Sequence, residues 1–212
     1  MRREFMLGAV VVGLLGVSVD AGAATQCTVG VKGGVGIANL GGADADSFAT
    51  DSRTGFVGGF FVQADMSKNF GVRLEGLYTM KGASDSQSGV DVTIKLDYIE
   101  FPILLVAQTP ASDAVTLSAF AGPTLGFNIN SEVEVSYLGV SGSADIEDVT
   151  GFEFGLAFGA GASFDMGSWS IVLDARYAMG MTTIDDSSDN ADVKNQEWIV
   201  MAGVGFPVGG SK

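Results

Sequence analysis

Two pairs of opposite charges have a spacing that could do chemistry. Arg73 and Glu75 stand two positions apart, and so do Asp174 and Arg176. On a β-strand, residues two apart point to the same face, so each pair would present both charges together. Facing charges of this kind form structural ion pairs or, less commonly, a path for protons or other ions. We expect structural pairing and keep an ion path as the alternative.

Composition excludes several other chemistries. The chain has 212 residues, no His, one Cys (Cys27) and a net charge of −14. Without His there is no His-based catalytic triad or His zinc site, and a single Cys cannot form an internal disulfide or a thiol redox pair. The shortage of Lys and Arg argues against nucleic-acid binding. We therefore expect no catalytic residue, no cofactor, no metal ligand set and no nucleic-acid partner.

The first residues look like a targeting sequence. A positively charged start is followed by an apolar run from Phe5 to Val19 and by the small residues Ala21–Ala24. This order is typical of a secretory signal peptide with its cleavage site. We assign residues 1–24 to the signal peptide and begin the mature domain, residues 25–212, after it. An uncleaved membrane anchor is the alternative.

The mature chain alternates apolar and polar residues with period two, which predicts half-buried strands. Each stretch has roughly 10–16 residues, longer than the usual strand of about 5–6 and long enough for the 9–11 that cross a bilayer at a tilt. The eight predicted strands cover residues 27–38, 54–66, 70–81, 95–108, 115–130, 151–165, 169–180 and 196–208.

The connections between these strands alternate strictly between short and long. Short connections are predicted at 67–69, 109–114 and 166–168, and long polar ones at 39–53, 82–94, 131–150 and 181–195. Antiparallel strands then place every short turn at one rim and every long loop at the other, as in outer-membrane barrels. The fold class predicted is all-β, an eight-stranded antiparallel up-and-down transmembrane β-barrel.

In such a barrel the apolar face must meet lipid, so the charged face lines the lumen. An eight-stranded barrel is just wide enough for its own side chains. We therefore expect a polar lumen plugged by side chains, with interior glycines making room. The charged residues predicted to point inward are Lys32, Asp65, Arg73, Glu75, Lys81, Glu100, Glu153, Asp174, Arg176 and Glu197. Apolar-face aromatics near both strand ends are typical of membrane girdles, namely Phe70, Phe164, Trp169 and Phe206 at one end and Phe56, Tyr78, Phe127, Phe152, Tyr177 and Trp198 at the other.

One strand resembles a known family. The segment from Lys95 to Leu105, with its Tyr98-x-Glu100-x-Pro102 pattern, resembles the signature strand of the PorT-like outer-membrane β-barrel family. The resemblance covers about residues 27–208 and implies a small OmpX/OmpA-type barrel in the outer membrane of a Gram-negative bacterium, in a family mostly without assigned activity. Because Pro102 cannot donate a ladder hydrogen bond, we expect a bulge or a lost bond there.

The function predicted is that of a non-enzymatic structural or interaction barrel with long acidic external loops. No spacing in those loops matches a calcium loop, so we interpret them as a solvated surface, with partner recognition as the alternative. Outer-membrane lipid and, through the loops, extracellular or envelope proteins are the expected partners of a monomeric barrel. The alternatives are a narrow pore, a soluble-type ligand-binding barrel and a secretion-accessory barrel. A membrane-embedded enzyme is disfavoured by the lack of His.

Overall fold

The computed structural model describes residues 26–41, 51–87, 89–137, 140–146, 149–183 and 193–208. The predicted signal peptide, residues 1–24, lies outside the described residues. Within them the chain forms β1 (Gln26–Gly41), β2 (Asp51–Asp65), β3 (Phe70–Gln87), β4 (Val90–Ser112), β5 (Val115–Tyr137), β6 (Val140–Asp145), β7 (Phe152–Asp165), β8 (Ser170–Gly180) and β9 (Lys194–Val208).

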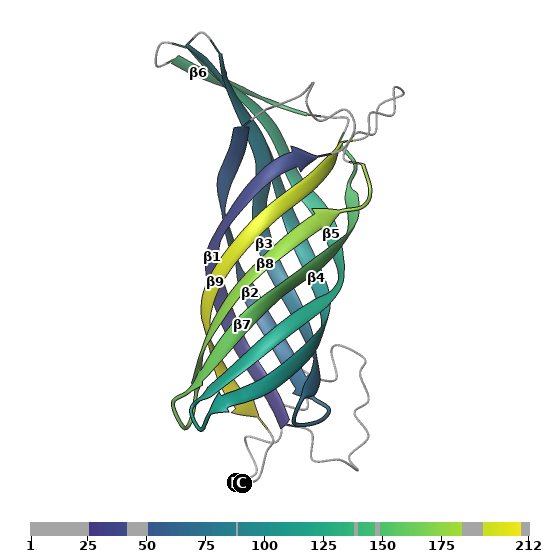
Figure 1. The fold of residues 1–212 in the computed structure, drawn as a ribbon. Coiled ribbons are helices and arrows are strands. Elements are labelled where there is room, and N and C mark those ends of the chain that lie inside the picture. Colours follow the sequence, from purple (N-terminus) through teal and green to yellow (C-terminus); the bar gives the residue numbers. More distant parts are fainter. Residues whose placement is uncertain are drawn as a thin grey trace.

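Eight of these strands close into a barrel (Figure 1). Each pairs antiparallel with its neighbours in the order β4-β3-β2-β1-β9-β8-β7-β5, and the β4–β5 pairing closes the ring. The ninth described strand, β6, pairs with β5 alone among the described strands and lies beyond the ring. The predicted eight-stranded antiparallel barrel is therefore confirmed, with one short strand added outside it.

The two rims differ as the loop pattern predicts. Short turns join β2 to β3, β4 to β5 and β7 to β8 at the lower end in Figure 1. In the first of these, the amide of Met66 donates to the carbonyl of Phe70 at 2.9 Å, and in the last, Met166 donates to Trp169 at 2.9 Å. Gly167, with φ +91, supplies the left-handed residue that the last turn needs.

Two of the four predicted long loops are instead strand extensions. The segment 82–94 continues β3 and β4 into a long hairpin, and 131–150 continues β5 and returns along it as β6. These segments carry regularly alternating β-branched residues, such as Val90, Val92 and Ile94, although the polar residues around them resemble those of a loop. The extensions form a four-stranded sheet, here named the external sheet, of β3 82–87, β4 90–96, β5 131–137 and β6.

The external sheet reverses the amphipathic pattern of the barrel. Val92 pairs with Val135 and Ile94 with Val133, while Lys95 pairs with Glu132 on the opposite face. Alternation along β4 is unbroken, so the valine face continues the inner surface of the barrel and the charged face continues its outer surface. Charged residues do not face hydrocarbon, so the lipid-facing zone ends near the β4–β5 bulge between Asp97 and Tyr98.

Below this level the outer surface is apolar. Exposed large side chains there include Val31, Phe60, Leu105 and Val200. Most of the predicted girdle aromatics are exposed at the two ends, and several touch one another: Phe127 lies 5.5 Å from Phe152, and Tyr177 lies 5.0 Å from Trp198, between ring centroids. No helix within the described residues is long and apolar enough to span a membrane.

Pro102 interrupts one ladder, as expected. Between β3 and β4 the pairing runs from Leu74–Ile103 directly to Leu77–Glu100, and it skips the two positions opposite Phe101 and Pro102. The register on both sides of the gap is the same, so the ring tolerates lost bonds without a bulge at this point.

Candidate functional site

The barrel interior gathers the charged residues that the sequence places there. Nine of the ten predicted inward charges are buried, from 5% exposed for Lys32 to 1% for Glu197. The tenth, Asp65, is half-buried near the end that carries the short turns. They project from most of the ring strands, and they separate into two groups along the lumen.

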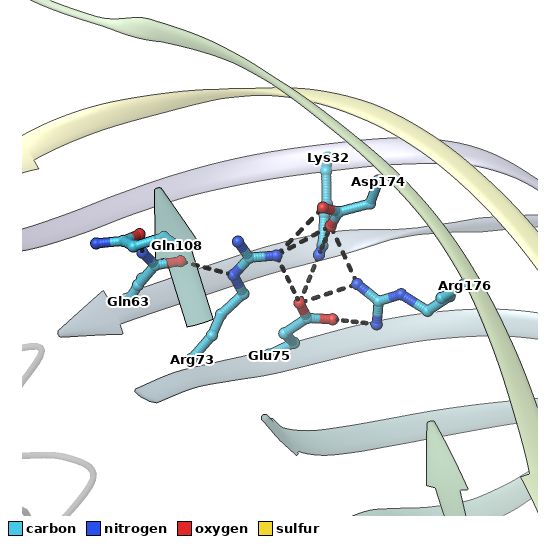
Figure 2. A network of polar contacts seen from close by, with 7 residues as sticks. All are labelled: Lys32, Gln63, Arg73, Glu75, Gln108, Asp174 and Arg176. Atoms are coloured by element: carbon cyan, nitrogen blue, oxygen red, sulfur yellow. Dashed lines mark hydrogen bonds and ion pairs between the residues drawn. The ribbon is translucent and has the colours of Figure 1, made fainter. Parts of the chain in front are cut away.

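The first group, here named the central network, consists of Lys32, Arg73, Glu75, Asp174 and Arg176 (Figure 2). Lys32 Nζ lies 2.5 Å from Glu75 Oε1 and 2.8 Å from Asp174 Oδ2. Arg176 donates to Glu75 Oε2 at 2.7 Å and to Asp174 Oδ2 at 3.1 Å, and Arg73 donates to Asp174 at 3.1 Å. The network thus ties β1, β3 and β8 together across the lumen and confirms that both predicted pairs point inward.

Two aromatic rings that the sequence analysis did not single out pack against these cations. The Arg73 guanidinium lies 5.7 Å from the Phe61 ring and 5.3 Å from the Phe120 ring, and Arg176 lies 5.1 Å from Phe120. Both rings are buried. Their position in the alternation was the available signal, because each stands out of phase with the apolar face of its strand. The rings add cation–π attraction and apolar volume to the lumen.

A polar chain leads from the central network toward the short-turn end. Arg73 Nε donates to Gln63 Oε1 at 2.9 Å, and Gln63 Nε2 donates to Asp65 Oδ1 at 2.8 Å and to Gln108 Oε1 at 3.1 Å. These residues line a cavity of about 370 Å³, together with Thr28 and other hydroxyl side chains. The lumen therefore contains a cavity between Arg73 and the short-turn end.

The second group, here named the outer cluster, lies toward the end that carries the external sheet. It consists of Lys81, Glu100, Glu153 and Glu197. Lys81 Nζ lies 2.6 Å from Glu100 Oε1 and 2.7 Å from Glu153 Oε1. Asn195 donates to the other Glu153 oxygen. The loop pattern predicts Asn195 at the end of a long loop, but Asn195 belongs to β9 and is 1% exposed.

Glu197 differs from every other carboxylate of the two groups. Both of its side-chain oxygens are buried and accept no hydrogen bond, and Asn195 Oδ1 is also buried without a donor. Within the described part of the chain, no three His, Cys, Asp or Glu side chains are grouped so that they could hold a metal ion.

Outside the lumen, Lys95 forms two ion pairs on the charged face of the external sheet. Lys95 Nζ contacts Glu134 and lies 3.7 Å from Glu132 Oε1. The hydrogen bond to Glu134 raises the pKa of the Lys95 ammonium. All six residues of β6, the strand of this sheet that pairs with β5, are exposed.

The chain is similar to several solved structures of bacterial surface and outer-membrane proteins. The attachment invasion locus protein Ail of Yersinia pestis is 20% identical, with a TM-score of 0.43, over 84% of this chain and 98% of that chain. Neisserial surface protein A is 15% identical, with a TM-score of 0.45, over 87% and 97%. The outer membrane protease OmpT of Escherichia coli is 6% identical, with a TM-score of 0.33, over 90% and 99%. No curated protein matches the sequence.

The family itself is shown by a family model. The model described as outer membrane protein beta-barrel domain matches residues 23–186, well over half of the chain. The chain therefore belongs to the outer membrane protein β-barrel domain family, and the protein lies in the outer membrane as a transmembrane β-barrel.

Proposed function

We propose that this protein is a non-enzymatic barrel whose lumen is closed by its own charged side chains and which binds extracellular or envelope proteins through the external sheet. The observation that carries the proposal is the central network, which joins β1, β3 and β8 across the barrel while the external sheet stands clear of the ring. Outer-membrane lipid surrounds a single barrel in this proposal.

Closure is supported by the burial and pairing of the network. All four carboxylate oxygens of Glu75 and Asp174 accept hydrogen bonds or ion pairs from Lys32, Arg73 or Arg176. In a low-dielectric interior, such pairs are strong only while they remain together, so an ion passing through would have to break several at once. Phe61 and Phe120 fill further volume beside the cations.

Binding through the external sheet is supported by its exposed edge and apolar residues. Tyr137 and Val140 are 54% and 75% exposed, although they lie beyond the lipid-facing zone. Among the described strands β6 pairs on one side only, which leaves backbone donors and acceptors available. Exposed apolar side chains beside a free strand edge suit a protein partner, either extracellular or in the envelope.

The non-enzymatic part of the proposal rests on the lack of His and on the pairing of every carboxylate of the two groups, except Glu197, with a buried base. The narrower resemblance to PorT-like barrels and a secretion-accessory role also stay predictions. A narrow pore is the main competing function, because a cavity of about 370 Å³ already opens within the lumen between Arg73 and the short-turn end.

Single-channel recording in a planar bilayer tests closure. We expect the wild-type barrel to give no stepwise current and Glu75→Ala, which unties the network, to give brief openings. Glu134→Ala, which changes an acid outside the lumen, is the matched control and should stay silent. Steady conductance of the wild type would contradict closure and favour the narrow pore.

Binding to a panel of immobilised extracellular and envelope proteins tests the second part. A variant in which residues 84–93 and 132–144 are replaced by short turns removes the external sheet and leaves the ring complete. We expect this variant to fold, as judged by heat-dependent gel mobility, and to lose binding that the wild type shows. Equal binding by both proteins would place the binding surface elsewhere.

A further inference from the structure

Glu197 occupies an unusual place in the lumen. It lies on β9 directly beside Trp198, at the end of the ring that carries the external sheet. Its side chain is 1% exposed, and its carboxylate lies so close to Gly36 of β1 that a Cβ at that glycine would overlap it. Neither carboxylate oxygen has a hydrogen-bond partner. An isolated ionised carboxylate in such surroundings is strongly disfavoured unless a donor or a cation meets it.

The charged groups that face Glu197 come from four other strands: Lys81 from β3, Glu100 from β4, Glu153 from β7 and Arg176 from β8. The terminal nitrogens of the two cations are engaged elsewhere, whereas Arg176 Nε is buried and has no hydrogen-bond partner. Lys81 is held by Glu100 and Glu153, and both terminal nitrogens of Arg176 donate to the central network. The outer cluster therefore has three carboxyl groups around one shared ammonium, and like charges at close range resist ionising together.

A metal ion is not the fitting answer to this excess of acid. No group of three possible ligands among the described residues is arranged to hold one. A proton needs no such coordination sphere. It also converts one acceptor of the carboxyl group into a donor, and Asn195 Oδ1, two residues away on the same face of β9, is a buried acceptor that lacks a donor.

We propose that Glu197 binds a proton in the folded barrel at neutral pH, so that the outer cluster is a proton-binding site at the external end of the lumen. The central network holds fixed charges, whereas the outer cluster changes its charge with pH. Alkaline conditions outside the cell would then load the lumen with an additional unpaired negative charge next to Glu100 and Glu153.

Infrared spectroscopy of the full chain refolded in lipid vesicles tests the proposal. With glutamate alone carrying carbon-13 at its carboxyl group, we expect one protonated-carboxyl band at neutral pH in the wild type. Glu197→Gln should lose this band, and Glu134→Gln, which alters an external acid, should keep it. No protonated band in the wild type, or a band that persists in Glu197→Gln, would overturn the proposal.

A second variant distinguishes loss of the protonated carboxyl group from misfolding of Glu197→Gln. Glu197→Asp keeps an acid at the position but moves it out of the labelled residue type, so the labelled band should vanish while the barrel stays folded. If the band disappears in sodium but not in choline buffer, a bound cation rather than a proton neutralises the site, and the proposal is wrong.

The pH dependence of unfolding gives an independent test. A glutamate in an unfolded chain ionises at about pH 4.3. Above this pH, the folded barrel with a protonated Glu197 therefore holds one more proton than the unfolded chain. Stability then falls as pH rises, and the folding constant of the wild type relative to Glu197→Gln should drop about tenfold per pH unit between about pH 6 and 7. Parallel curves for the two proteins would contradict the proposal.

Discussion

The central network and the outer cluster lie in the same lumen, but their buried charges are balanced differently. The central network sets three cations against two carboxylates, and each carboxylate oxygen has a donor. The outer cluster sets Lys81 against three carboxylates, and both oxygens of Glu197 lack one. Both groups are enclosed by the same ring of antiparallel strands. They therefore differ in the number of hydrogen-bond donors available to each carboxylate and not in the fold around them.

This difference indicates a division of labour along the barrel. A network in which every carboxylate oxygen is paired is rigid in a low-dielectric interior, because any movement exposes an uncompensated charge. A cluster with more carboxyl groups than cations can change its net charge, because it can take up or release a proton without movement of the backbone. Closure is therefore expected to reside in the central network and responsiveness in the outer cluster.

Truncating Glu75 should have the largest effect of single substitutions in the lumen. Glu75→Ala leaves Lys32 and Arg176 buried without their carboxylate, and breaking a buried ion pair in this way destabilises a protein by about 3–5 kcal/mol. Urea unfolding of the barrel in lipid vesicles measures the change. A loss as small as that of Glu134→Ala would mean that water reaches the central network and that it does not close the lumen.

Crowding the outer cluster should have an intermediate effect. Gly36→Ala places a methyl group against the Glu197 carboxylate, and overpacking of this kind costs about 1–3 kcal/mol. The same unfolding measurement applies. Gly33→Ala is the matched control on the same strand, because its nearest neighbour to the added carbon, Phe56, lies at 3.7 Å. Equal losses for the two variants would show that Glu197 moves aside freely.

Much of this fold was predictable because successive residues of a strand in a membrane barrel face the lipid and the lumen in turn. The alternation of apolar, lipid-facing residues with charged, lumen-facing residues predicts the strands and the ring. It also predicts the nine charged side chains that are buried in the lumen. Pairing could not be predicted, because which carboxylate meets Lys32 or Arg176 depends on strand stagger around the ring, and a single sequence does not specify stagger.

The parts that were missed follow from the same rule. The external sheet obeys the opposite alternation, with valines such as Val92 and Val135 inward and Lys95 outward, so a search for lipid-facing strands classified it as loop. Phe61 and Phe120 were overlooked because apolar residues were expected outside. The two rings are buried against the cations, and the alternation of apolar and polar residues alone does not predict such packing.

Replacing Phe120 should separate aromatic from merely apolar packing in the central network. Phe120→Leu keeps an apolar side chain but removes the ring that Arg73 and Arg176 face, and we expect a loss of about 1 kcal/mol. Thermal and urea unfolding in lipid report it. Phe206→Leu, on the exposed outer face, should cost less. A larger loss at Phe206 would indicate that the lipid girdle outweighs the cation–π contacts.

The smallest effect is expected outside the lumen, at Lys95. Its ion pairs with Glu132 and Glu134 lie on the water-exposed face of the external sheet, where solvent and salt screen them. Because Glu134 raises the pKa of Lys95, this pair contributes to stability below the ordinary lysine range and loses that contribution as pH rises through the raised value. Lys95→Ala should therefore leave urea unfolding at neutral pH unchanged within error, at low and at high salt. A clear loss that vanishes in high salt would show that the external sheet is electrostatically coupled to the ring, and the contrast between fixed interior charges and an independent external surface would then have to be redrawn.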